Sequence, residues 1–393
     1  MGTQAGQEPE TAAAGALTLA DKVSFLSQPK AYGKPAGSVS RRETHMSWIF
    51  FDGDLVFKLK KPVRFAYLDF STLARREAAC RAELRLNRRL APDVYLDVVP
   101  LVWTQRGFAI GGTGGIPVDW LVMMRRLDEA STLENRLLDH PVGLRDLAKL
   151  VDSLAAFYRY AASVRMTPHS HLAEWHRNLC DNRRVLLDPE LAPAVAGLVR
   201  KIDAAQRRFL DANPELFAAR AAARKIVDGH GDLRPEHIFI NDRIRIIDCL
   251  EFNAGLRAID PLDEVAFLCV ECDRLGASWA SDYLRHRILQ TWERGPGPEA
   301  LFSFYRCYRA TLRARLALAH LLEPNPRTPE KWPRLSCTYL RIAARDAARL
   351  ERILGPPRAV KPLCKPYRLS RFFNSASGRV LMTSRASSQP RRA

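Results

Sequence analysis

The chain has 393 residues, of which 47% are hydrophobic and 26% are charged, and its formal net charge is +18. This length and apolar content suffice for a large core and predict two lobes or domains. No apolar run approaches the roughly 18 residues of a membrane helix, so an association with the membrane is not expected.

The two ends of the chain differ in composition from the rest. Residues 1–16 lack the basic and apolar regions of a secretory signal, so we expect a disordered leader there. In residues 357–393 every charged side chain is Lys or Arg, and Ser and Pro are frequent. This composition predicts a disordered tail that either is simply solvated or binds nucleic acid or another anionic surface.

The eight cysteines are scattered and fall mostly in helical or apolar stretches. This distribution favours buried thiols in a reducing cytoplasm over a disulfide framework. Cys269 and Cys272 form a CxxC without a second pair, so we expect two thiols on adjacent helix turns rather than a zinc site.

From residue 17 onward the pattern predicts a small sheet with one helix. An Asp-Gly turn after residue 51 is typical of a hairpin, and a Ser or Thr at 71–72 can cap the helix that follows. The expected elements are a short helix at 17–26, a Gly/Pro linker, hairpin strands at 46–51 and 55–60, a helix at 71–90, and strands at 94–102, 108–110 and 120–127.

The remainder reads as mostly helical, with apolar residues recurring at helical spacing. The predicted helices are 144–160, 172–187, 192–210 and 215–224, followed by a helical region from 260 to about 354. The exception is residues 225–248, which are β-like. This β-like segment contains the most informative motif of the chain.

That motif is His230-Gly231-Asp232-Leu233 with a second aspartate, Asp248, directly after an isoleucine-rich run. In phosphoryl transfer one such aspartate takes the proton of a substrate hydroxyl and the other holds Mg²⁺ on the ATP phosphates. The position five after the first aspartate is Asn in the pattern H-R-D-L-x-x-x-N, and here it is His237.

The same chemistry needs a lysine on the phosphates and a glutamate that holds the lysine. Lys58 lies on the second hairpin strand, with Val56 on the same face, where the valine can pack on an adenine ring. Lys60 shares this face, but the residue two before it is a lysine and not an apolar side chain, so we prefer Lys58. Glu83 in the following helix is the expected partner, and Glu77 is the alternative.

Together these motifs resemble the aminoglycoside phosphotransferase-like kinase family, which shares the protein-kinase fold. The resemblance spans roughly residues 35–320, and its matching stretches are 56–58, 83–92, 123–127, 230–233, 247–252 and 260–266. Residues 43–48 are similar to a bacterial branch of the family. Some members of that branch carry a C-terminal P-loop kinase domain, whose G-x-x-x-x-G-K-[ST] motif this sequence lacks.

The resemblance implies an α+β, bilobal, protein-kinase-like fold. A small N-terminal nucleotide-binding lobe with a β-sheet and one helix would cover residues 17–127. A larger, mostly helical catalytic and substrate lobe would cover 128–354, and the basic tail would cover 355–393. The turn at 44–47 would lie over the phosphates.

The resemblance also implies a role for each motif residue. Asp232 would be the catalytic base, Asp248 the Mg²⁺ ligand, Lys58 the phosphate lysine and Glu83 its orienting partner. The remaining expectations are an adenine site at Val56, Met124, Arg125 and Leu127, and structural support of the catalytic loop by His230 and by Asp263, the latter through hydrogen bonds to the loop backbone.

The predicted function is therefore an ATP-dependent kinase that phosphorylates a hydroxyl of a small molecule, with ATP and Mg²⁺ or Mn²⁺ as cofactors. The positive charge disfavours a polycationic acceptor, and Arg309, Arg313 and Arg315 on one predicted helix favour an anionic or neutral one.

His237 leaves three interpretations open. It ligates Mn²⁺ or a weakly held second metal; or it hydrogen-bonds Asp232 and leaves one metal on Asp248, helped by Glu251 or Asn253; or the site binds nucleotide without turnover, as in a pseudokinase. We favour the second interpretation. The basic tail keeps a fourth possibility open, a protein that binds nucleic acid or an anionic surface.

Overall fold

The computed structural model describes residues 17–356, except for 66, 113, 140, 192, 294–295, 323–325 and 327. The elements below belong to one unit of the chain, which ends at Gly355. The expectations for the leader at 1–16 and for the basic tail at 357–393 concern residues outside this description.

An antiparallel sheet of six strands forms the first part of the fold. Its strand order is β1 (Ser40–Glu43), β2 (Ser47–Asp52), β3 (Leu55–Lys60), β8 (Ile116–Arg125), β6 (Tyr95–Thr104) and β7 (Gly107–Ile110). The predicted hairpin is confirmed as β2 and β3, which are joined by a turn in which Gly53 has a φ of +58°. Strand β1 was not predicted, because its four residues are all polar and exposed and carry no hydrophobic alternation.

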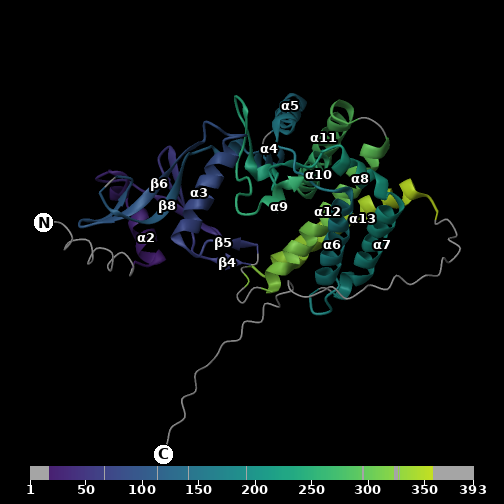
Figure 1. Ribbon diagram of the computed structural model, residues 1–393, viewed down its shortest axis with the longest axis horizontal. Helices are drawn as coiled ribbons and strands as arrows, with labels where there is room; N and C mark the ends of the chain where they lie inside the picture. The colour runs from purple at the N-terminus through teal and green to yellow at the C-terminus, as the bar shows by residue number, and fades with distance from the viewer. Residues whose placement is uncertain are drawn as a thin grey trace, which may run out of the picture. The chain divides into compact units, whose positions relative to one another are not determined.

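One long helix, α3 (Leu73–Asn87), lies along the sheet beside β6 and β8, as Figure 1 shows. The hydroxyl of Thr72 caps it by accepting a hydrogen bond from the N–H of Arg75. Cys80 and Glu83 on this helix are completely buried, so the helix brings a carboxylate as well as apolar groups to the sheet. The smaller elements of this part are α2 (Leu19–Leu26), η1 (Pro29–Tyr32) and the hairpin β4 (Arg64–Phe65) and β5 (Leu68–Asp69).

Helices dominate the chain after the sheet, as predicted. Helices α6, α7, α12 and α13 lie against one another (Figure 1). The elements are η2 (Glu129–Ser131), α4 (Leu133–Leu138), α5 (Leu144–Tyr160), α6 (Pro168–Leu186), η3 (Pro193–Val195), α7 (Ala196–Ala212), α8 (Pro214–Ala222), α9 (Ala254–Arg257), α10 (Pro261–Arg274), α11 (Ser278–Thr291), α12 (Pro296–Ala319), η5 (His320–Leu322) and α13 (Lys331–Leu354).

Short strands interrupt the helices where the β-like segment was predicted. They are β9 (Val227–Asp228), which pairs with β12 (Ala258–Ile259), and the hairpin β10 (Ile238–Ile240) and β11 (Ile244–Ile246). The one-turn helix η4 (Pro235–His237) precedes β10. The two aspartates of the motif therefore lie on either side of this hairpin, Asp232 before it and Asp248 after it.

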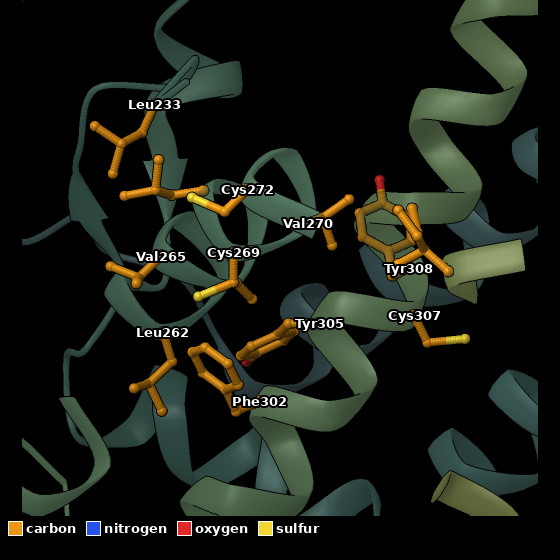
Figure 2. Close-up of a cluster of buried hydrophobic side chains, with 14 of the residues drawn as sticks. Leu233, Leu262, Val265, Cys269, Val270, Cys272, Phe302, Tyr305, Cys307 and Tyr308 are labelled. Atoms are coloured by element: carbon orange, nitrogen blue, oxygen red, sulfur yellow. The ribbon is translucent and has the colours of Figure 1, made fainter. Parts of the chain in front are cut away.

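The largest hydrophobic cluster combines residues of β10 and β11 with residues of the surrounding helices. Figure 2 shows side chains of α10 and α12 packed together, with Leu233 of the motif loop in the same cluster. Leu233 is completely buried, so the loop that carries Asp232 is anchored in the core by the next residue. Cys269 and Cys272 are buried free thiols on neighbouring turns of α10.

The observed architecture confirms the predicted α+β class, a sheet part followed by a larger helical part. The boundary between the lobes at residues 127 and 128 stays a prediction. Within the described ranges, none of the helices combines the length and the apolar character that a bilayer crossing requires.

Candidate active site

Lys58 on strand β3 reaches two carboxylates that are distant in sequence. Its Nζ lies 2.8 Å from Oε1 of Glu83 and 2.8 Å from Oδ1 of Asp248. Burial opposes the charge on the amine, but Asp248 and Glu83 outweigh burial and raise the pKa of Lys58. The alternative partner, Glu77, instead pairs with Arg81 in an exposed contact on α3.

A second lysine shares the same glutamate. Lys60 is 1% exposed, its Nζ lies 2.6 Å from Oε2 of Glu83, and it also pairs with Oε1 of Glu251. Although burial opposes ionisation of Glu83, the two lysines lower the pKa of this carboxyl. The sequence presented Lys60 as a rival of Lys58, whereas the structure gives both lysines to Glu83.

Asp248 has an unusual backbone conformation that two distant side chains hold. Its φ is +63°, in the left-handed region that non-glycine residues rarely adopt. The hydroxyl of Tyr95 accepts a hydrogen bond from the N–H of Asp248 at 3.2 Å, and Oδ1 of Asn87 accepts one from the N–H of Cys249 at 2.8 Å. Lys58 holds the pKa of Asp248 well below its usual range. The turn thus presents an ionised carboxylate whose side chain is 46% exposed.

His230 is hydrogen-bonded to the loop that carries Asp232. The ring is buried, and Nε2 lies 2.9 Å from the carbonyl oxygen of Ile247, which accepts the hydrogen bond. Nδ1 is therefore the acceptor of the bond that the N–H of Asp232 donates at 3.2 Å. Burial lowers the pKa of His230, which agrees with a neutral ring in this position.

The backbone of the loop is also held by a carboxylate, but not by the predicted one. Glu264 accepts hydrogen bonds from the N–H of His230, at 3.0 Å, and from the N–H of Gly231. Asp263 is instead held by Arg309, whose Nε and Nη2 lie 2.7 and 2.6 Å from its oxygens. The prediction for Asp263 is therefore corrected. Neighbouring helix residues point about 100° apart, and it is Glu264 that faces the loop.

Arg234 contacts both Asp232 and His237. Nδ1 of His237 lies 2.9 Å from the carbonyl oxygen of Asp232, and its Nε2 lies 3.2 Å from Nη2 of Arg234. Nε of Arg234 lies 3.1 Å from Oδ2 of Asp232, and Nη1 lies 2.9 Å from Glu236. Nε2 of His237 is also 3.6 Å from Oδ2 of Asp248. The arginine was not predicted, although it lies only two residues after Asp232.

These groups open onto one cavity of about 610 Å³. Its lining includes the predicted base Asp232 and the residues assigned to nucleotide and metal, namely Val56, Lys58, Met124, Arg125, Leu127, His237 and Asp248. Val56 and Met124 belong to an apolar cluster that Ile247 joins from the opposite part of the chain. The cavity is therefore apolar around Val56 and charged around Lys58, and it offers one region to a flat apolar ring and another to phosphates.

The turn between β1 and β2 forms another wall of this cavity. Thr44, Met46 and Ser47 line it, and the turn is closed by two bonds of 2.9 Å between Thr44 and Ser47. The turn has no glycine-rich motif, and the expectation that residues 44–47 lie over bound phosphates stays a prediction.

Two of the three arginines that favoured an anionic acceptor have other partners. Arg309 is bound to Asp263, and Nε of Arg313 lies 2.8 Å from Glu271, which is completely buried. Neither arginine lines the cavity. Because they lie outside the cavity lining, Arg309 and Arg313 give no support to an anionic acceptor.

The donor atoms present fit a magnesium ion that is shared with phosphates. In the part of the chain that the structure describes, no group of three or more His, Cys, Asp and Glu side chains could hold a metal by itself. Mg²⁺ is commonly bound by one or two carboxylates together with substrate phosphates, and Asp248 offers such a carboxylate. The two suggested helpers have other partners, since Lys60 holds Glu251 and the N–H of Gly255 binds Asn253.

Comparison with known proteins identifies relatives and a shared fold. No protein-family model matches the chain. The uncharacterised proteins Rv2004c of Mycobacterium tuberculosis and Mb2027c of Mycobacterium bovis are each 31% identical over 293 residues, which cover 72% of this chain and 56% of the relative. The chain thus spans little more than half the length of these relatives.

Among solved structures, a choline/ethanolamine kinase family protein from Mesorhizobium loti matches with a TM-score of 0.50 and 16% identity. The match covers 85% of this chain and 100% of that protein. At this identity the likeness establishes the fold, and the predicted kinase-like fold is confirmed.

Proposed function

We propose that the chain is an ATP-dependent phosphotransferase, of the aminoglycoside phosphotransferase-like kinases, that moves the γ-phosphate of ATP to a hydroxyl of a small molecule. The observation that carries this proposal is the position of Lys58, whose amine lies 2.8 Å from both Glu83 and Asp248. The cavity that this lysine enters also contains Asp232. Phosphoryl transfer depends on positioning and charge neutralisation, and these residues supply both.

Each residue has a defined task in the reaction. Val56 and Met124 would pack on the adenine, and Lys58 would bind phosphate oxygens. Asp248 would hold Mg²⁺, whose charge neutralises the phosphates in the transition state. Asp232 would accept the proton of the substrate hydroxyl as its oxygen bonds to the γ-phosphorus. The bond from that phosphorus to the bridging oxygen breaks, and ADP leaves.

Two features of the free site prepare this chemistry. Glu83 is completely buried and pairs with Lys58, so the amine of Lys58 would keep its direction when a phosphate replaces Asp248 as its other partner. His230 and Glu264 fix the backbone before Asp232, so the base has a defined position before substrate arrives. Such preorganisation lowers the reorganisation that the reaction requires.

The test is ATP turnover across a broad panel of hydroxyl compounds, with Mg²⁺ and with Mn²⁺. We expect turnover that disappears in Asp232→Ala and persists in the matched control Asp242→Ala, whose side chain is 69% exposed in the β10–β11 hairpin. Thermal melts establish that both variants are folded. A folded wild-type protein without turnover on any compound would sink the proposal.

A second function has its own supporting observation, since Arg234 engages His237 at the position where a kinase carries Asn. A pseudokinase would bind nucleotide through Lys58 and the apolar pocket without turnover. It predicts that ATP binding is unchanged when divalent metal is removed, and that His237→Asn creates activity in an inactive parent.

A further inference from the structure

The two ring nitrogens of His237 have different hydrogen-bond partners. A carbonyl oxygen can only accept a hydrogen bond, so Nδ1, at 2.9 Å from the carbonyl of Asp232, carries the proton. A guanidinium can only donate, so Nε2, at 3.2 Å from Nη2 of Arg234, provides its lone pair. Both ring nitrogens of His237 are therefore engaged by other groups of the loop.

This arrangement removes a metal ligand from the site. In protein kinases the Asn of the catalytic loop holds a second Mg²⁺, which neutralises the phosphates together with the first. Here Nε2 of the replacing residue is in contact with an arginine. The hard oxygen ligand that Mg²⁺ prefers is absent from position 237, and imidazole suits softer metals.

A permanent cation already lies beside that position. The guanidinium of Arg234 spans from Oδ2 of Asp232 to Nε2 of His237, and the arginine lines the cavity with a side chain that is 22% exposed. Nε2 of His237 in turn is 3.6 Å from Asp248. The positive charge thus lies against the base and against Glu236, whose Oε1 is 2.9 Å from Nη1, and His237 links it to the carboxylate of Asp248.

We infer that the guanidinium of Arg234, held by His237, replaces the second divalent cation, so that the protein binds nucleotide with a single metal ion on Asp248. This inference depends on the proposed function. A planar guanidinium binds phosphate oxygens through paired hydrogen bonds, which a spherical ion cannot direct in the same way. Burial opposes the charge, but Asp232 and Glu236 raise the pKa of Arg234 further above neutrality, so the cation persists at every physiological pH.

The number of bound metal ions tests the inference without turnover. Mn²⁺ is titrated into the full chain in the presence of saturating AMPPNP, and free Mn²⁺ is measured from its electron paramagnetic resonance signal. We expect one Mn²⁺ per chain in the wild type. In the double variant Arg234→Gln, His237→Asn the amide oxygen is restored and the guanidinium is gone, so we expect two.

Nucleotide affinity provides the second measurement. Arg234→Gln should weaken AMPPNP binding roughly 10- to 100-fold, the range expected for losing a charge-assisted hydrogen bond to phosphate. The matched control is Arg136→Gln, because the side chain of Arg136 is 21% exposed, pairs with Asp146 at 2.9 Å and lies outside the cavity lining. We expect this control to bind like the wild type. Arg234→Lys keeps the charge but not the paired donors and should bind between the two.

The outcomes separate this inference from the proposed function. Two Mn²⁺ per wild-type chain, or equal AMPPNP affinity of the folded variants Arg234→Gln and Arg136→Gln, would overturn the inference and leave the kinase proposal standing. A folded wild-type chain that does not bind AMPPNP at all would contradict both.

Discussion

The hydroxyl of Tyr95 gives the sharpest test of how the turn at Asp248, the proposed metal ligand, is held. Tyr95→Phe removes one oxygen and keeps the ring in its place, where it is 1% exposed. The hydroxyl accepts a hydrogen bond from the N–H of Asp248 at 3.2 Å. In the variant this N–H has lost its acceptor and faces the edge of a buried ring. A donor stranded in this way costs about 1–3 kcal/mol. Since this bond is long and joins neutral groups, we expect a value near the lower end, about 1–2 kcal/mol.

The same bond supports a strained conformation. A non-glycine residue in the left-handed region costs roughly 1–2 kcal/mol, which is close to what the bond provides. Without the bond, the φ of +63° at Asp248 loses its support and other conformations of the turn become populated. Since 1.4 kcal/mol corresponds to a factor of ten, the affinity for Mn²⁺ with AMPPNP should fall roughly 5- to 30-fold.

The assay combines urea unfolding with the Mn²⁺ titration, and the control is Tyr32→Phe. The hydroxyl of Tyr32 donates to the carbonyl of Leu26 at 2.7 Å near α2, away from the cavity. Both variants should lose stability, but only Tyr95→Phe should lose metal affinity. If the two variants bind Mn²⁺ equally well, the hydroxyl does not position Asp248 and the reasoning is refuted.

Three further outcomes can be measured directly. Lys60→Met strands the buried carboxylate of Glu251, so unfolding free energy should drop by about 3–5 kcal/mol in urea titration. Gly229→Ala would place its Cβ 2.5 and 2.7 Å from neighbouring side-chain atoms, so the free energy of unfolding should drop by about 1–3 kcal/mol. Gly143→Ala, whose Cβ would have nothing nearer than 4.0 Å, should be tolerated in the same urea titration. The pKa of Asp248 in the folded chain lies below the unfolded value of about 3.9, so its charge stabilises the fold above that pH, and this stabilisation is lost as the pH falls further. The urea concentration at the unfolding midpoint should therefore decline more steeply with falling pH in the wild type than in Asp248→Asn.

The sequence revealed those site residues that carry a local pattern. Lys58 follows an alternating strand, Asp248 ends an isoleucine-rich run, and Asp232 follows a His-Gly pair. Each pattern has a physical basis that needs no knowledge of the rest of the chain. The same holds for the hairpin that carries Lys58 and for the long helix that carries Glu83, which the structure confirms as elements.

The supporting residues carry no such pattern, because their contacts join distant positions. Tyr95 and Asp248 are 153 residues apart, Asn87 and Cys249 are 162 apart, and Lys60 and Glu251 are 191 apart. An isolated Tyr or Asn in a strand or helix reads as an ordinary half-buried residue. Only the packing of the sheet part against the strands of the helical part assigns these side chains their partners.

The two lysines on Glu83 explain how the site can exchange partners without losing its shape. Lys60 is 1% exposed and joins Glu83 to Glu251, whereas Lys58 is 15% exposed and joins Glu83 to the half-exposed Asp248. Removing one partner of a buried pair is costly, while a partly exposed pair can reform with another anion at little cost. In the proposed reaction, phosphate would replace Asp248 on Lys58 and free that carboxylate for the metal. During this exchange the buried pair of Lys60 and Glu251 keeps strand β3 tied to the loop that follows Asp248.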